Sequence, residues 1–189
     1  APGGGGGAAM AGALAAALAS MVANLTIGKE KFAEREPEVK ELLKQAEAER
    51  VRLLQLADDD AAVFNSFMSC YKLPKTTDEE KAARTAAIRA AAKQAATVPL
   101  NIARSSFAVL KLADRLVVSG NPGVITDGAC SGLLARAALR CAEYNVRINL
   151  GLTKDEEWNA QVAADLKQLL ADAEALETRL LAVTDKALQ

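Results

Sequence analysis

Eighteen consecutive residues near the start of the chain, Ala8 to Leu25, carry no charge, and about half of them are alanine. A run of this length either spans a membrane or forms a helix that is buried on all sides in a helical protein. Ser20 and Asn24 lie in its last turns, and no second apolar span follows it. We therefore interpret the run as the buried central helix of a protein that does not enter a membrane.

The rest of the chain shows apolar residues at helical spacing and no stretch that alternates with period two. Pro74 and the turn residues from Ser119 to Gly123 separate the segments. The pattern predicts a helix from about Glu36 to Tyr71 and another from Thr77 to about Val118. A further helix is predicted to end at about Leu150 and to begin at Thr126 or Asp127, either of which can be its cap. The last predicted helix follows a capping box at Thr153–Glu156.

The last of these helices has a clean apolar stripe formed by Val162, Leu166, Leu169, Ala173, Leu176, Leu180 and Val183. Alanine is the best helix former, and its small side chain lets helices pack closely. We expect an all-α fold, a multihelical bundle of about five main helices around the Ala/Gly-rich central helix. We expect a single domain over residues 1–189, with a kink near Pro99.

Composition excludes several chemistries. The chain has no histidine, which rules out a Ser-His triad, a histidine-ligated zinc and an imidazole base. Its formal net charge of −1, with basic and acidic residues interspersed, argues against a nucleic-acid partner. Cys70, Cys130 and Cys141 are widely spaced, and we interpret them as core residues of a protein in a reducing compartment, either cytoplasm or an organelle stroma or matrix. The start of the sequence suggests a processed or trimmed N-terminus.

The glycine run before the apolar helix is the first feature that packing alone does not explain. The opening residues, Ala1 to Gly7, are expected to form a flexible loop and neither helix nor strand. Their N–H groups and the positive end of the following helix suit an anion or a polarised carbonyl. A floppy terminus is the other interpretation, and the sequence leaves both open.

Three consecutive carboxylates, Asp58 to Asp60, interrupt an apolar stripe in the middle of a predicted helix. Successive side chains point about 100° apart, so one carboxylate lies near the apolar side. Asp60 is the best candidate, because Phe64 follows one turn later. A carboxylate against an apolar wall has a raised pKa and can act as an acid or a base near neutrality. A solvated helix face is the alternative.

Amide side chains form the third feature. Asn145 and Asn149 lie one turn apart on an otherwise apolar helix, where they point the same way and can bind the edge of a heterocycle. Asn121 and Asp127 precede them, and helix capping explains Asp127 equally well.

These segments together resemble the methenyltetrahydrofolate cyclohydrolase and formiminotetrahydrofolate cyclodeaminase family. The matching residues are collinear: Pro2 to Gly5, Ser20 to Val22, Asn24 to Lys29, Asp60 with Phe64, Leu73 to Lys75, Thr77 to Glu80, Val98 to Leu100, Gly120 with Asn121, Thr126 with Asp127, and Asn145 with Asn149. Gly6 departs from the serine that many members carry at this position.

The resemblance implies a homodimeric folate enzyme that needs no metal and no cofactor, with the site near the subunit interface. The implied catalytic residues are Asp60, which would position or deprotonate water, and Asp127, a second acid/base or pterin anchor. The implied substrate-binding residues are Gly3, Gly4, Gly5, Asn24, Lys75, Asn121, Asn145 and Asn149.

Two folate reactions fit this resemblance. Hydrolysis of 5,10-methenyltetrahydrofolate to 10-formyltetrahydrofolate is favoured by the glycine-rich opening. The alternative is a cyclodeaminase that converts 5-formiminotetrahydrofolate to the methenyl form and ammonia. A catalytically silent helical interaction module also remains open.

Overall fold

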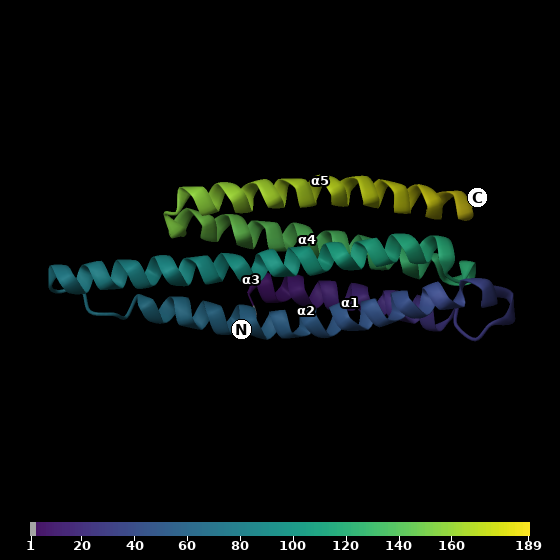
Figure 1. Ribbon diagram of the computed structural model, residues 1–189, viewed down its shortest axis with the longest axis horizontal. Coiled ribbons are helices and arrows are strands. Elements are labelled where there is room, and N and C mark those ends of the chain that lie inside the picture. Colours follow the sequence, from purple (N-terminus) through teal and green to yellow (C-terminus); the bar gives the residue numbers. More distant parts are fainter. Residues whose placement is uncertain (1–2) are drawn as a thin grey trace.

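The computed structural model describes residues 3–189, and this part of the chain contains five α-helices, two short 3-10 helices and no strand (Figure 1). The α-helices are α1 (Gly4–Asn24), α2 (Glu36–Cys70), α3 (Asp78–Ser119), α4 (Ile125–Thr153) and α5 (Glu156–Ala187). The 3-10 helices are η1 (Glu30–Arg35) and η2 (Pro122–Val124). The predicted all-α fold is confirmed.

The first four helices form an up-and-down bundle. α1 packs on α2 and α4, α2 packs on α3, and α3 has its largest contact with α4. α5 lies in the groove between α3 and α4 (Figure 1). The end of α2 and the start of α3 extend beyond the other helices as a protruding hairpin, seen at the left of Figure 1.

α1 is the uncharged helix that the sequence placed at the centre. By length and composition it is apolar enough to cross a membrane, but 61% of its most apolar stretch is buried inside the bundle. Small residues allow this packing: a side chain at Gly12 would lie 3.1 Å from a methyl carbon of Leu53 and 3.0 Å from the hydroxyl of Ser106. The Oγ of Ser131 on α4 donates to the Ala15 carbonyl at 2.7 Å. α1 is therefore a core helix of the bundle.

The prediction that the glycine run is a loop was wrong for the residues that the structure describes. α1 begins at Gly4, with Gly3 as its N-cap, while Ala1 and Pro2 lie outside the described residues. Each glycine costs about 1 kcal/mol relative to alanine in a helix. Tertiary contacts outweigh this cost, because Gly5 and Gly6 are buried against neighbouring helices.

Helix ends were predicted less well than helix bodies. The capping box at Thr77 and Glu80 is present. α4, however, begins at Ile125 after Val124, so Thr126 and Asp127 lie inside its first turn and neither caps it. α5 is capped by Asp155, whose carboxylate accepts from the Trp158 N–H at 3.1 Å, and not by Thr153. α3 continues through Pro99 as one helix.

The cysteine prediction was also wrong. Cys130 and Cys141 are exposed on α4, and Cys70 is half-buried. Cys130 and Cys141 lie on one face of α4, where Leu133, Tyr144 and Ile148 are exposed as well. The described part of the chain does not cover this face.

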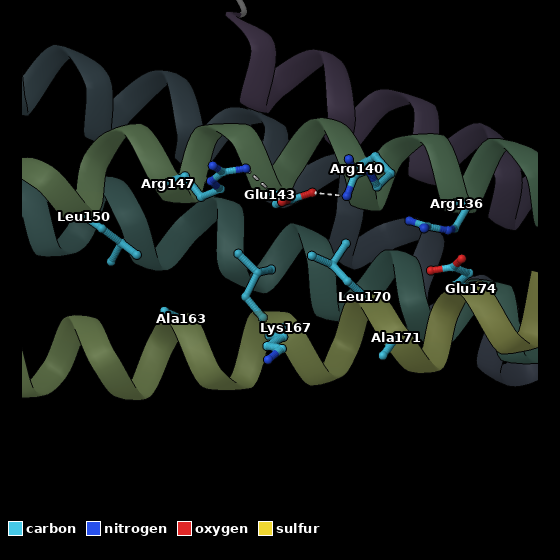
Figure 2. A pocket seen from close by; sticks show the side chains of 11 residues that line it. Arg136, Arg140, Glu143, Arg147, Leu150, Ala163, Lys167, Leu170, Ala171 and Glu174 are labelled. Carbon is cyan, nitrogen blue, oxygen red and sulfur yellow. Dashed lines mark hydrogen bonds and ion pairs between the residues drawn. The ribbon is translucent and has the colours of Figure 1, made fainter.

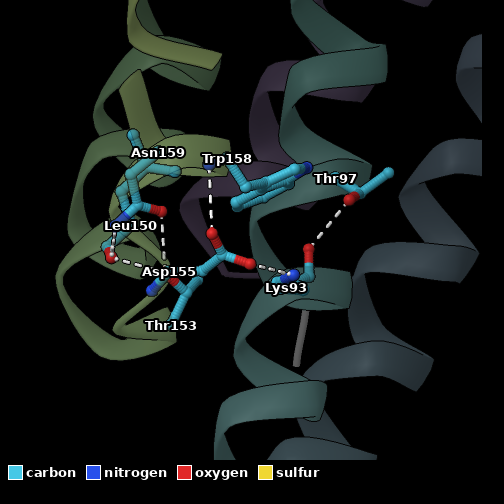
Figure 3. Close-up of polar contacts among 7 residues, drawn as sticks. All are labelled: Lys93, Thr97, Leu150, Thr153, Asp155, Trp158 and Asn159. Carbon is cyan, nitrogen blue, oxygen red and sulfur yellow. Dashed lines mark hydrogen bonds and ion pairs between the residues drawn. The ribbon is translucent and has the colours of Figure 1, made fainter. Parts of the chain in front are cut away.

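Polar contacts attach α5 to α3. The Lys93 ammonium lies 2.5 Å from the Asp155 carboxylate and 5.5 Å from the centre of the Trp158 ring (Figure 3). Farther along, the Arg179 guanidinium binds the buried Asp114 carboxylate through both its Nε, at 2.8 Å, and its Nη2. These pairs fix the register of α5 against the bundle.

Candidate functional site

A cleft of about 460 Å³ opens where the start of α1 meets the C-terminal third of α2, Ala95 of α3 and the end of α4. Apolar side chains form most of its wall, and among the described residues that line it Asp60 is the only charged one. Its lining residues are Gly3, Gly4, Gly5, Asp60, Ala61, Val63, Phe64, Phe67, Ala95, Asn145, Ile148, Asn149 and Leu152. A mainly apolar cleft with a few convergent polar groups is the usual form of a small-molecule site.

Asp60 faces this cleft, while Asp58 is exposed and Asp59 accepts a hydrogen bond from Gln55 on the outer side of α2. The Oδ2 of Asp60 accepts from the backbone N–H of Gly6 at 2.9 Å. Burial raises the pKa of Asp60, and the Gly6 hydrogen bond opposes part of that rise. The carboxylate is thus poised to take up or release a proton closer to neutrality than an exposed aspartate.

The glycines are required by how closely α1 approaches α2 and α4. A Cβ on Gly5 would lie 2.6 Å from the Cγ of Asp60, and one on Gly4 would lie 3.1 Å from the Asn145 Nδ2. Gly6 donates its N–H to Asp60, so one of the free N–H groups at the start of α1 binds the protein's own carboxylate. The glycine run therefore forms the floor of the site.

Asn145 and Asn149 lie on the cleft side of α4, as the sequence predicted. The Nδ2 of Asn145 donates to the Cys141 carbonyl at 2.8 Å. The Nδ2 of Asn149 donates to the carbonyl oxygens of Ala95 and Asn145. Both side chains use their amide nitrogen within the protein and have their amide oxygens left for a ligand.

A second hollow of about 440 Å³ lies between α4 and α5 (Figure 2). Its charges are paired: Glu143 binds Arg140 at 2.6 Å and Arg147 at 3.3 Å, and Arg136 binds Glu177 at 3.2 Å. These ion pairs account for its charged residues apart from Lys167 and Glu174. We interpret this hollow as a structural groove and the Asp60 cleft as the candidate site.

Three other predicted site residues lie at the opposite end of the bundle. Asn24 ends α1, about 30 Å of helix from Gly4, and Asp127 lies about 27 Å along α4 from Asn145. Asn121 is buried there and acts within the protein. Its backbone N–H donates to the Thr26 hydroxyl at 2.9 Å, and its Nδ2 donates to the Leu25 carbonyl at 3.1 Å. The structure does not bring these residues to Asp60 within one subunit.

Lys75 is exposed in the connection between α2 and α3. It is separated from Asp60 by the last turns of α2, and it does not line the cleft. The structure therefore separates Lys75 from Asp60, Asn145 and Asn149.

The apolar lining was the part that sequence reasoning missed. Val63, Phe67, Ile148 and Leu152 lie beside the polar residues already singled out. Val63, Ile148 and Leu152 lie one turn from Asp60, Asn145 or Asn149, and Phe67 lies two turns from Asp60, all on the same helix faces. This spacing could have identified them. Ala95 of α3 also lines the cleft.

The fold and the site define a helical bundle protein with a carboxylate-bearing cleft between the start of one helix and two others. The Formiminotransferase-cyclodeaminase family matches residues 1–168, and the chain belongs to this family.

Two curated relatives and one solved structure illustrate the similarity. The methenyltetrahydrofolate cyclohydrolase of Methylorubrum extorquens is 45% identical over 179 residues, which cover 95% of this chain and 86% of that protein. The formimidoyltransferase-cyclodeaminase of Sus scrofa is 34% identical over 92% of this chain, which spans only 32% of that longer protein. The formiminotetrahydrofolate cyclodeaminase of Thermotoga maritima superposes with a TM-score of 0.88 at 29% identity, over 100% of this chain and 90% of that one.

Proposed function

We propose that the protein hydrolyses 5,10-methenyltetrahydrofolate to 10-formyltetrahydrofolate in the Asp60 cleft. The observation that carries the proposal is the half-buried Asp60 carboxylate, which faces an apolar cleft beside two amide side chains. The similarity to the cyclohydrolase of Methylorubrum extorquens covers most of both chains and favours this reaction.

In this proposal Asp60 acts as the general base. Its carboxylate takes a proton from water as the water oxygen adds to the cationic methenyl carbon, which becomes tetrahedral. The bond from N5 to this carbon then breaks, and N5 keeps the electron pair and takes the proton back from Asp60. The hydroxyl group on the carbon loses its proton to solvent, so the carbon remains on N10 as the formyl group. The negative charge of Asp60 also stabilises the cationic substrate. These steps need no metal and no redox cofactor.

The apolar walls support this role. Phe64, Phe67 and Ile148 offer surfaces on which the flat pterin ring can pack. Asn145 and Asn149 present amide oxygens at the α4 side of the cleft. The ring would lie between α2 and α4, with its one-carbon unit toward Asp60 and the glycine floor.

The near-ultraviolet absorbance of methenyltetrahydrofolate tests the proposal, because this absorbance is lost on hydrolysis. Purified protein is expected to accelerate the loss well above that in buffer. A rate equal to that in buffer, in a protein whose helical content is intact, would favour the silent interaction module.

Cyclodeaminase activity is the second candidate, supported by the solved relative from Thermotoga maritima and by the longer animal proteins. In that reaction N10 attacks the carbon of the protonated 5-formimino group, Asp60 accepts the N10 proton and passes it to the former imino nitrogen, and this nitrogen leaves as ammonia. Release of ammonia from 5-formiminotetrahydrofolate, at a rate exceeding hydrolysis of the methenyl form, would replace the first proposal by this one.

We further propose that the protein is a homodimer. An apolar stripe of exposed side chains runs along the outer faces of α1 and α4: Met10, Leu14, Met21, Leu133, Tyr144 and Ile148. A monomer seldom leaves so continuous an apolar face in water. Ile148, the most exposed at 72%, also lines the cleft, so this α1–α4 stripe reaches the candidate site.

The two ends of the α1–α4 stripe carry different groups of predicted site residues. The cleft with Asp60 lies at one end, and the exposed Asn24 and the partly exposed Asp127 continue the same helix faces at the other. Most homodimers pair one surface with itself about a two-fold axis. With that axis across the middle of α1, the two stripes run antiparallel, and Asp127 of the partner subunit would approach the cleft. This arrangement supports a role for Asp127 that one subunit alone does not.

A further inference from the structure

Pro99 lies inside α3, where a proline removes one hydrogen bond of the helix. Because its nitrogen carries no hydrogen, the carbonyl oxygen of Ala95, four residues earlier, has no donor within the helix. α3 nevertheless continues without a break from Asp78 to Ser119. Pro99 is buried and Ala95 is half-buried, so this carbonyl needs a donor from another part of the chain.

The donor comes from α4. The Nδ2 of Asn149 lies 2.9 Å from the Ala95 carbonyl oxygen and 2.8 Å from the Asn145 carbonyl oxygen. A carboxamide nitrogen has two hydrogens, and both are used by these two backbone acceptors. An amide oxygen cannot donate to either carbonyl, so the two contacts also determine which atom of the Asn149 amide is nitrogen.

This arrangement fixes what Asn149 offers to a ligand. Ala95 and Asn149 both line the cleft, and the bound nitrogen leaves the amide oxygen as the free polar atom of the side chain. Because an amide oxygen only accepts hydrogen bonds, it matches an N–H or O–H group of the ligand and disfavours an acceptor at the same place.

We propose that Pro99 is a positioning residue of this site, and that it acts by holding the Asn149 amide with its oxygen toward the substrate. The Ala95 carbonyl that Pro99 leaves free anchors the amide nitrogen. The identity of the ligand rests on the function proposed above: the N–H groups of a tetrahydrofolate ring would bind this oxygen. The orientation of the Asn149 amide does not depend on which ligand binds.

The variant Pro99→Ala tests the proposal because it returns an N–H to position 99. The Ala95 carbonyl then receives a donor within α3, and the Asn149 amide is freed from one of its two anchors. Helix propensity favours alanine, so the fold is retained. We expect the KM for 5,10-methenyltetrahydrofolate to rise about 3- to 10-fold, as for one neutral hydrogen bond, with kcat changed by less than about twofold.

Thr97→Ala is the matched control. Thr97 lies in the same turn of α3, and its hydroxyl donates to the Lys93 carbonyl at 2.8 Å (Figure 3). It does not line the cleft. The KM of this variant is expected to equal that of the wild type, and an equal rise in both variants would mean that any disturbance of this turn weakens binding, which would overturn the proposal.

A double variant distinguishes a positioning role of Pro99, exerted through Asn149, from a general structural effect of the substitution. Asn149→Leu removes the amide, so Pro99→Ala should add nothing to KM in that background if Pro99 acts through Asn149. Independent effects that multiply in the double variant would overturn the proposal.

Crystal structures of the wild type and of Pro99→Ala give a readout that does not depend on activity. We expect the distance from the Asn149 Nδ2 to the Ala95 oxygen to exceed about 3.5 Å in the variant. An unchanged contact would overturn the positioning role. If the contact breaks as expected but the wild type turns over neither folate, the proposed function fails and the positioning role stands.

Discussion

At the scale of single residues, the site depends on how close α1 comes to Asp60. The absent side chain at Gly5 leaves room for the carboxylate, and the N–H of Gly6 holds it at 2.9 Å. The position of the Asp60 carboxylate, its hydrogen bond from Gly6 and its raised pKa therefore all depend on the close approach that glycine allows at the start of α1.

Gly5→Ala is expected to lower kcat/KM at least about 100-fold, because the new methyl group occupies the place of the Asp60 carboxylate and displaces the base. Gly7→Ala is the matched control. It adds the same methyl group two residues away in the same helix, where nothing lies within 4 Å. Steady-state kinetics on both variants checks this, and equal losses in the two would contradict the account.

Some of these residues could be predicted from the sequence and others could not. Asp60 was separated from Asp58 and Asp59 because Phe64 lies one turn away, and that local argument needs only helical geometry. The helical state of Gly4 to Gly7 could not be predicted, since it depends on Asp60 and Asn145, which are distant in the sequence. Val124 as the residue before α4 carries no capping signal at all.

At the scale of elements, α5 is attached to the bundle by ion pairs of unequal burial. Asp114 on α3 is 1% exposed and receives two hydrogen bonds from Arg179. Arg104 and Asp165 also join α3 to α5, at 3.3 Å, but both are about half exposed. Arg179 itself is largely exposed, so the two pairs differ in the burial of the carboxylate. The pair that contains the buried Asp114 is the one expected to matter, because water screens the pair whose two side chains are both exposed.

Arg179→Ala should lower the free energy of unfolding by about 2–4 kcal/mol, since it leaves the buried Asp114 carboxylate without its partner. Arg104→Ala, which removes the exposed pair, should lower it by less than about 1 kcal/mol. Urea unfolding followed by circular dichroism measures both. Similar midpoints for the two variants would show that burial does not distinguish these pairs.

At the scale of the whole molecule, the predicted site residues other than Lys75 form two groups at opposite ends of α1. This separation could not be predicted from the sequence, because helix lengths and directions place Asp127 far from Asp60 only once the bundle is folded. The exposed α1–α4 stripe between the two groups suggests how a second subunit can reunite them.

Mixing inactive subunits tests this arrangement. If Asp127 of the partner subunit completes the cleft, Asp60→Asn and Asp127→Asn homodimers are each nearly inactive. Their mixed dimer contains one site with both aspartates intact, and mixing followed by subunit exchange should restore part of the activity. No recovery in mixtures shown to contain mixed dimers would contradict the arrangement, as would a fully active Asp127→Asn variant.

The proposed hydrolysis depends on Asp60 as a base whose pKa is raised by burial. Asp60→Asn tests this because it removes the charge and keeps the shape. A base works when ionised, so wild-type kcat should fall as the pH is lowered through the raised pKa of Asp60, which lies above the ordinary value of about 3.9.

The raised pKa also predicts an effect on stability. Folding favours the neutral form of Asp60, so ionisation of this carboxyl group lowers the free energy of unfolding as the pH rises through the same window. Asp60→Asn should therefore be at least as stable as the wild type at neutral pH.

The decisive measurement is kcat for methenyltetrahydrofolate hydrolysis by the wild type and by Asp60→Asn across this pH range. We predict a loss of at least about 100-fold in the variant and no acidic limb in its profile. A variant that keeps the wild-type kcat and the same acidic limb would contradict the account.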